Sequence, residues 1–347
     1  MCPTVRENIQ RAENALEELG RGSADKPDWL GFFQEPQAHL QSVWSKSSSA
    51  ELRKKVLREL PEDERALFRS HGGIGAGGYL QPPAEDTPVM PDKHFVITAR
   101  DQLGLHVSAE GATCQHRYAD GRLCGEPLDR RGMHARQCNV GGALTRKHDN
   151  LRDWAGGEHE RRTGHSVAFE QRVPAWDKEV VLEDGSTVVQ EAVLDFATRD
   201  PITDRQIWVD ATVVSAYSTN PARLHSHANK DGVAAAQAVN GKHRRYQAEE
   251  GALVALAFET GGRPSEETIN FFKSWHTSSL GDSTAVPLVN LWQHCSVVLQ
   301  LGNAEQLLSA LGNGASRPRF APAEASQDVL MASDSQDVNM AAAVGGA

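Results

Sequence analysis

Two aspartates set among apolar neighbours are the first residues whose types and spacing suggest chemistry. In "VLDFATRDPITDRQIWVDATVV", residues 193–214, two strand-like runs flank a polar turn, and each run holds one acid, Asp195 or Asp210. A turn centred on Ile202 and Thr203 would place these acids opposite each other, with Cβ atoms about 4.5–5.5 Å apart. Carboxylates that close repel unless they share a proton, a neighbouring cation or a divalent metal. Of these, a divalent metal fits best, and oxygen ligands favour Mg²⁺. In the alternative, a register slip of one residue would put the acids on opposite faces and leave one in solvent.

A lysine and a tyrosine on the following predicted helix are the partners that we expect for these acids. Lys242 and Tyr246 lie four residues apart in "GKHRRY", so they share one helix face. A lysine beside a metal can orient or deprotonate a water, or stabilise charge on a phosphate. Lys230 is the second choice for this role, Glu170 is a further candidate metal ligand or nearby acid, and Glu259 is a weaker one. The alternatives are a solvated basic patch for the lysine and a surface position for Glu170.

Three cysteines and a histidine form a second cluster with metal-ligand chemistry. The cluster comprises Cys114, Cys124, His134 and Cys138, separated by nine, nine and three residues. His134 and Cys138 lie one helical turn apart and can bind one ion together. Three thiolates and one imidazole are a usual tetrahedral set for structural Zn²⁺. Reduced cysteines packed in a core are the alternative, and His116 could replace one ligand.

Composition limits the function classes. The 347-residue chain has a net charge of −10, so it is not a basic nucleic-acid binder as a whole. It has no apolar run of 18 residues or more and no signal-peptide pattern, so we expect a soluble intracellular protein that does not interact with a membrane. Five cysteines in such a chain do not indicate a disulfide framework. The stretches "DRRGMHARQC", "LTRKHDNLRD" and "HERRTGH" suit phosphate contact, or form a solvated helix face balanced by acids.

The expected elements place both clusters in an α/β (α+β) architecture. Helix, three strands, helix and strand follow one another after the cysteine cluster, which favours one mixed sheet flanked by helices. We expect helices at 5–20, 49–60, 92–105, 144–164, 225–251, 264–275 and 287–311, and strands at 165–173, 186–198, 205–214 and 252–260. The predicted division is a helical N-terminal region with a Gly/Pro-rich linker at 1–108, the zinc cluster at 109–142, the sheet domain at 143–311 and a disordered tail at 312–347.

Residues 66–311 resemble the C-terminal part of non-LTR retrotransposon proteins that carry a restriction-like endonuclease. The resemblance is carried by "GMHARQC" with the upstream cysteines, "RKHDNLRD", "VLDFAT", "WVDATVV" and "KHRRY". It implies a Cys-Cys-His-Cys zinc knuckle followed by a PD-(D/E)XK restriction-endonuclease-like domain. The chain itself shows no reverse-transcriptase signature, so we expect a fragment of a larger element, a truncated copy or a host gene derived from one.

The resemblance also implies roles for individual residues. Asp195 and Asp210 match the two acids of the family and would hold Mg²⁺, helped by a backbone carbonyl near Ala211. A metal-activated water would hydrolyse a phosphodiester bond of DNA and leave a 3′ hydroxyl. Lys242 would polarise the water or the phosphate, and Tyr246 would support it. The zinc knuckle and the basic helix after it would hold the DNA, and RNA of the element is a further expected partner.

Three positions depart from the family pattern. The second acid, Asp210, is Asp rather than Glu. Leu194 stands where the motif has proline, and Thr212 stands where it usually has lysine. From the acid pair and the resemblance we predict a nuclear, Mg²⁺-dependent endonuclease. Its alternative is a catalytically decayed, zinc-containing nucleic-acid-binding module, and a third possibility is a plain structural or interaction protein. Metal-dependent nicking of DNA separates the first two, and a chain that binds neither zinc nor nucleic acid would favour the third.

Overall fold

The computed structural model describes most of the chain between the two ends. The described residues are 40–84, 87–182, 184–277 and 288–313, together with residues 7, 10, 11 and 14. Apart from residues 7, 10, 11 and 14, the helix predicted at 5–20 lies outside them, as does nearly all of the tail predicted at 312–347. No helix in the described ranges combines the length and apolar character needed to cross a membrane.

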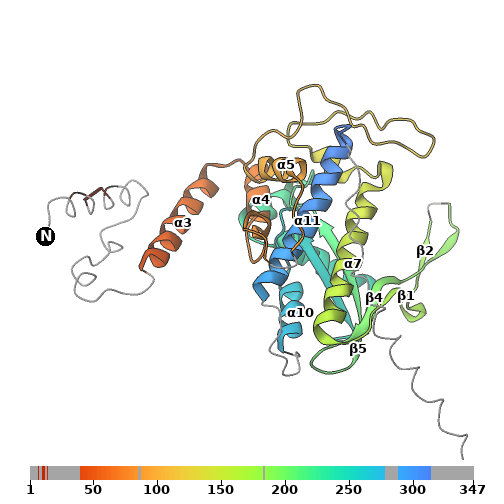
Figure 1. The fold of residues 1–347 in the computed structure, drawn as a ribbon. Coiled ribbons are helices and arrows are strands. Elements are labelled where there is room, and N and C mark those ends of the chain that lie inside the picture. Colours follow the sequence, from red (N-terminus) through yellow and green to blue (C-terminus); the bar gives the residue numbers. More distant parts are fainter. Residues whose placement is uncertain are drawn as a thin grey trace, which may run out of the picture.

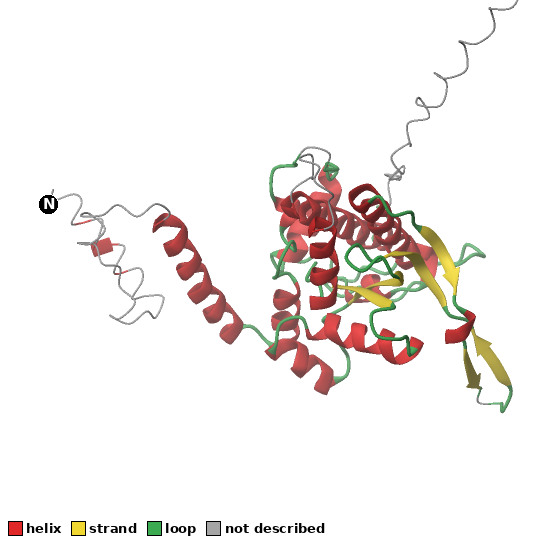
Figure 2. Ribbon diagram, turned by 90° about the horizontal axis from the view of Figure 1, so that it is seen from below, coloured by secondary structure: helices red, strands yellow, loops and turns green. Residues whose placement is uncertain are grey.

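A four-stranded mixed sheet forms the centre of the molecule, as predicted. Its strand order is β1-β4-β5-β6; β1 and β5 run antiparallel to β4, whereas β6 runs parallel to β5. A separate two-stranded ribbon, β2-β3, projects from the body (Figures 1 and 2). The strands are β1 Ala168–Arg172, β2 Lys178–Val181, β3 Thr187–Gln190, β4 Val193–Arg199, β5 Gln206–Val214 and β6 Leu253–Glu259.

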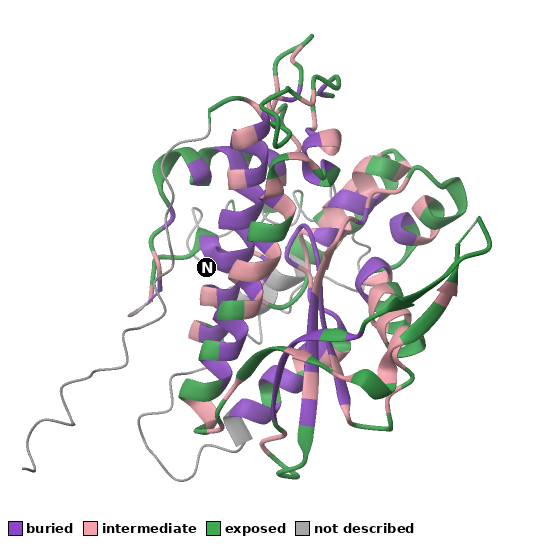
Figure 3. Ribbon diagram, turned by 90° about the vertical axis from the view of Figure 1, so that its right-hand side faces the viewer, coloured by how far each residue is buried: buried purple, intermediate pink, exposed green. Residues whose placement is uncertain are grey.

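Helices cover both faces of this sheet (Figure 3). On one face α7 and α10 pack with α11 over a core that includes Phe196, Val209 and Leu256. On the other face α9 contacts β5 and β6. The helices are α3 Leu40–Glu59, α4 Glu62–Ser70, α5 Asp92–Gln102, α6 Met133–Gln137, α7 Ala143–Thr163, α8 Pro221–Asn229, α9 Val233–Tyr246, α10 Glu266–Thr277 and α11 Leu288–Ala310, with short 3-10 turns at Gly78–Leu80, Val140–Gly142 and Pro174–Trp176.

The single helix predicted at 225–251 is wrong, because the structure has two helices there. Helix α8 ends at Asn229, and Gly232, with a φ of +73°, precedes α9. Between them the Asp231 carboxylate forms ion pairs with Arg53, Arg69 and Arg263. A loop can present the carboxylate to three arginines at once, and glycine permits the left-handed turn that follows.

The strand predicted at 186–198 is likewise two strands. Ala192 interrupts it, because its backbone N–H donates to the Asp177 carboxylate instead of continuing a ladder. Residues 187–190 turn away to pair with β2, a strand that the sequence analysis did not anticipate. Val181 and Val189 of this ribbon are exposed, so its sequence lacks the alternation that marks a half-buried strand.

Helix α11 joins the cysteine cluster and the N-terminal region to the sheet domain. It is buried on nearly all sides, and Leu307 and Leu308 near its end pack against Cys114 and Cys138. Farther back along the same helix, Leu301 packs against Tyr79 and Met90. The segments predicted as separate regions therefore share packing along one helix (Figure 1).

Candidate metal centres

The β4–β5 hairpin sets two buried aspartates against each other. Backbone pairing ends at Phe196 and Val209, so the next pair in this register is Asp195 and Asp210. Just beyond the ladder, Oδ2 of Asp195 accepts a hydrogen bond of 2.5 Å from the backbone N–H of Ala211. The predicted hairpin register is confirmed from Arg199 and Gln206 to Phe196 and Val209. The two acids beyond it are 9% and 4% exposed.

Helix α9 brings a cation and a phenol to the second aspartate. Nζ of Lys242 lies 2.7 Å from Oδ2 of Asp210. Burial raises the pKa of Asp210, while the Lys242 ammonium and the Tyr246 hydroxyl act to lower it. Burial, together with the negative charge of Asp210, also raises the pKa of Tyr246, so its hydroxyl stays protonated near neutral pH. The structure thus brings together four of the residues selected from the sequence.

Helix α7 adds a histidine that the sequence analysis did not select. Nε2 of His148 is 3.2 Å from Oδ2 of Asp195, and the hydrogen bond to that carboxylate raises the pKa of His148 to about 9. One available signal was its position three residues before Leu151, on the apolar side of a predicted helix, which directs it toward the sheet. One ligand atom each from His148, Asp195 and Asp210 lies within 4.8 Å of the others.

This group fits a divalent cation. Oδ2 of Asp210 is buried, yet it accepts no well-aligned hydrogen bond from the described residues. Its ion pair with Lys242 supplies charge but leaves lone pairs free. A carboxylate oxygen can accept from more than one partner, so this oxygen can bind a cation beside Lys242. Two carboxylates suit Mg²⁺ or Mn²⁺, and the imidazole of His148 extends the range toward transition metals.

Glu170 is not part of this group. It occupies the register position opposite Asp195, but its φ of +51° breaks the pairing between Phe169 and Gln171. Its exposed carboxylate instead lies 2.9 Å from a guanidinium nitrogen of Arg152. The structure therefore places this candidate on the surface beside an outer strand.

The remaining candidates, Glu259 and Lys230, also lie outside this group. The buried Oε1 atom of Glu259 accepts hydrogen bonds from the backbone N–H groups of Ala234 and Ala235, at the start of α9. Burial raises the pKa of Glu259, and these amides act to lower it. Lys230 follows the end of α8 in extended conformation and is exposed.

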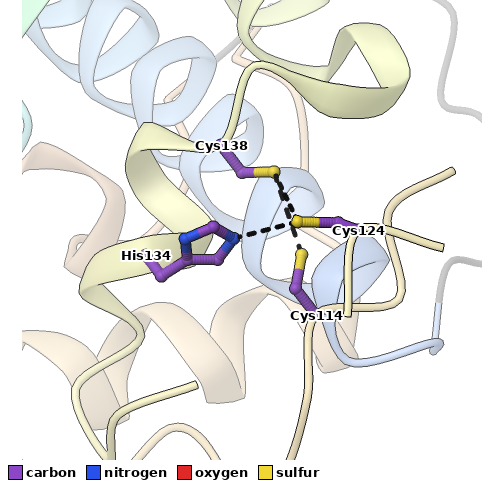
Figure 4. A group of neighbouring side chains, drawn as sticks. All are labelled: Cys114, Cys124, His134 and Cys138. Carbon is purple, nitrogen blue, oxygen red and sulfur yellow. Dashed lines mark hydrogen bonds between the residues drawn. The ribbon is translucent and has the colours of Figure 1, made fainter. Parts of the chain in front are cut away.

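The cysteine–histidine cluster converges as predicted (Figure 4). Sγ of Cys138 lies 3.8 Å from that of Cys124 and 3.9 Å from that of Cys114. Nε2 of His134 lies 3.4 Å from Sγ of Cys124. Zinc–sulfur bonds of ~2.3 Å at tetrahedral angles give sulfur–sulfur edges of ~3.8 Å, whereas a disulfide measures about 2.05 Å. These distances match a tetrahedral metal site and exclude disulfides among the three thiols.

Local sequence explains how these ligands are held. The Asp129 carboxylate accepts hydrogen bonds from backbone N–H groups at the start of α6, including that of Met133, and so fixes the helix that carries His134. Burial raises the pKa of Cys114 to about 12, so a bound cation is needed to favour its thiolate. His116 is not a ligand: its Nε2 pairs with the Ser309 hydroxyl at 2.7 Å and ties the cluster to α11.

The basic stripe predicted around α7 is largely paired within the protein. Arg161 and Arg162 bind Glu158, and Arg136 binds Asp101. Lys147 is buried and donates to a side-chain oxygen of α11, which leaves it no solvent-facing role. The surface of α7 therefore offers fewer free cations to a phosphate backbone than its sequence suggested.

Comparison with known proteins adds no family assignment, because no family model, no curated protein and no solved structure matches the chain. The functional argument therefore depends on the geometry of the two centres.

Proposed function

We propose that the protein is a metal-dependent DNA endonuclease that hydrolyses phosphodiester bonds. The observation that supports this most is the group formed by His148, Asp195 and Asp210, whose ligand atoms lie within 4.8 Å of one another at the end of the β4–β5 ladder. Both acids are buried, and Asp210 pairs with the Lys242 ammonium. Buried like charges with a cationic neighbour are typical of reactive sites.

The residues of the group would hold the cation in different ways. Asp195 is oriented by the Ala211 amide, and Asp210 by the ion pair with Lys242. His148 reaches the same point from the opposite helix layer. A bound divalent cation would supply charge stabilisation for the phosphate and acidify a bound water.

Lys242 would act on the phosphate or on the attacking water. Its ammonium lies 2.7 Å from a buried carboxylate oxygen, while its side chain keeps 28% of its surface exposed. It can therefore reach a substrate from a position that is already fixed, which favours stabilisation of developing negative charge. Tyr246 flanks Asp210 and packs against Trp176 at a ring-centroid distance of 5.9 Å, so its hydroxyl is held in place.

The order of elements supports a PD-(D/E)XK restriction-endonuclease-like domain. One helix, three strands of the main sheet, a helical segment and a parallel strand follow one another from α7 to β6. The two acids lie on adjacent strands and the lysine on the following helical segment, as the resemblance to retrotransposon endonucleases implies. Nuclear action on chromosomal DNA is part of this proposal.

Nicking of supercoiled plasmid tests the proposal. The wild-type chain with added Mg²⁺ or Mn²⁺ should nick the plasmid, and Asp210→Asn should abolish nicking while DNA binding is retained. Asp204→Asn is the matched control, since Asp204 lies in the same hairpin but is exposed and paired with Arg199. Intact DNA binding without nicking by any variant would instead favour the non-catalytic binding module.

A further inference from the structure

The tip of the cysteine–histidine knuckle is a small, well-supported hairpin. We call residues 117–123 the knuckle tip. Arg117 and Leu123 form a β-bridge at its base, and Cys114 and Cys124 of the candidate zinc site lie just outside that bridge. The metal cluster and the backbone pairing together hold this tip in one conformation.

One face of the tip carries an aromatic ring beside a guanidinium group. Tyr118 pairs with Arg122 through a backbone hydrogen bond of 2.8 Å, so the two side chains share a face. The guanidinium carbon of Arg122 lies 4.4 Å from the centroid of the Tyr118 ring. Gly121, with a φ of +85°, and the Asp120 carboxylate, which accepts the Arg122 backbone N–H, shape the turn between them.

The apolar groups of the tip contribute nothing to the described cores. Tyr118 is 41% exposed and Leu123 is 38% exposed, and neither belongs to an apolar cluster in the described ranges. A single exposed aromatic is ordinary. An exposed aromatic fixed under an arginine, at the end of a rigid turn, is more specific, because it presents a flat surface with positive charge beside it.

We propose that the Tyr118–Arg122 face of the knuckle tip binds an unpaired base of a single-stranded nucleic acid. Aromatic and guanidinium planes are the surfaces on which proteins stack splayed bases. The tip carries Arg117 and Arg122 against one acid, Asp120, whose carboxylate lies 3.8 Å from Nε of Arg122. A net positive charge remains, and it suits the adjoining phosphates. This inference rests on the proposed function in taking nucleic acid as the ligand, and it adds where and in what form that ligand is bound.

Helix α7 connects the knuckle to the candidate active site. Helix α7 starts at Ala143, shortly after Cys138, and carries His148 five residues later. At 1.5 Å of rise per residue, His148 lies ~7.5 Å along the axis from the start of the helix. The knuckle is therefore connected to the carboxylate group through the N-terminal end of α7.

Binding measured without added Mg²⁺ tests the proposal separately from cleavage. The probes are short fluorescein-labelled single strands of DNA and of RNA and a DNA duplex of equal length, titrated with the zinc-loaded full chain. Tyr118→Ala should weaken single-strand binding about 5- to 150-fold, the equivalent of ~1–3 kcal/mol for one stacked base. Tyr118→Phe keeps the ring and should bind as the wild type does. Arg122→Ala should also weaken binding and flatten its salt dependence.

Each outcome decides the matter. Loss in Tyr118→Ala with retention in Tyr118→Phe, at unchanged zinc content and unchanged duplex affinity, supports a stacking site. A comparison of the DNA and RNA strands then shows which one the tip prefers. Equal single-strand affinity in wild type and Tyr118→Ala overturns the proposal, whatever the nicking assay shows. Conversely, failure of plasmid nicking with a Tyr118-dependent affinity would remove the endonuclease and leave the tip as a binding site.

Discussion

Lys242 lies 2.7 Å from the buried Oδ2 atom of Asp210 and links helix α9 to strand β5 at the candidate active site. The lysine offsets only part of the burial, because the pKa of Asp210 remains raised. A carboxyl group whose pKa is raised in the folded state contributes stability below its unfolded pKa, and that contribution is lost as the pH rises through the raised folded pKa. Near neutral pH, the buried carboxylate of Asp210 therefore lowers the stability of the fold.

Replacement of Asp210 by asparagine should consequently stabilise the protein while abolishing nicking. Lys242 is 28% exposed, so water can solvate it when the carboxylate is gone. We expect a gain of about 1 kcal/mol, or ~2–4 °C in Tm, in metal-free buffer at neutral pH. Thermal unfolding of wild type, Asp210→Asn and Asp204→Asn measures this. A fall in Tm confined to Asp210→Asn would show that the aspartate is a structural ion-pair partner instead.

Divalent cations should stabilise the wild-type chain through the same group. Binding to the folded state alone adds about 2.7 kcal/mol at 100-fold excess over the Kd. Asp195→Asn should lose this effect, because it removes a charged ligand while retaining an acceptor for the Ala211 amide. Titration with Mn²⁺ and Mg²⁺ in a thermal-shift assay is the measurement. Stabilisation of equal size in Asp195→Asn would place the cation elsewhere.

Lys242→Met should separate chemistry from metal binding. The substitution preserves much of the apolar stem but removes the ammonium near Asp210. Nicking should fall ~10²–10⁴-fold if the lysine takes part in proton transfer or charge stabilisation, whereas cation-induced stabilisation should persist. Arg244→Met, on the same helix but exposed, is the control. A variant that nicks at the wild-type rate would exclude Lys242 from the reaction.

The central sheet and the acid pair were predictable because short-range patterns determine them. The turn at residues 200–205 fixes the hairpin register, and Asp195 and Asp210 directly follow its last pair, Phe196 and Val209. The spacing of Lys242 and Tyr246 likewise follows from helix geometry. These inferences needed no knowledge of how distant segments pack.

Features that depend on long-range contacts were missed. His148 meets Asp195 because α7 crosses the sheet at one particular angle, which local sequence does not encode. The helix predicted at 225–251 is interrupted at Asp231, where Arg53, Arg69 and Arg263 converge on the carboxylate. Glu170 was a candidate ligand because it lies in the first predicted strand, but its backbone has a φ of +51° and its carboxylate pairs with Arg152.

The cysteine–histidine cluster should hold one zinc ion that is required for the fold of the knuckle. Cys124→Ser should lose zinc and destabilise the chain by several kcal/mol, because ligand binding is coupled to folding. Cys295→Ala is the control, since Cys295 lies in the main core, away from the cluster. Elemental analysis with unfolding curves measures both effects. Full zinc content in Cys124→Ser would rule out the four-ligand site.

Acid sensitivity should come in part from His159. This side chain is fully buried, stacks on Phe271 and meets Trp275 edge-on, with the backbone of Arg199 as a polar neighbour. Burial, with the neighbouring His165, lowers the pKa of His159 to about 4. Between pH 6.5 and 4, His159 binds a proton in the unfolded chain but stays neutral in the folded chain. Stability should therefore fall as the pH drops through this window, by on the order of 3 kcal/mol.

His159→Phe tests this assignment, because phenylalanine keeps the ring contacts and has no proton to bind. Urea unfolding at pH 7 and at pH 5 should show a smaller loss of stability on acidification in this variant than in the wild type. His106→Gln, which changes an exposed imidazole, should retain the wild-type loss. Parallel pH dependence in wild type and His159→Phe would mean that other groups, such as the paired carboxylates, account for the acid sensitivity.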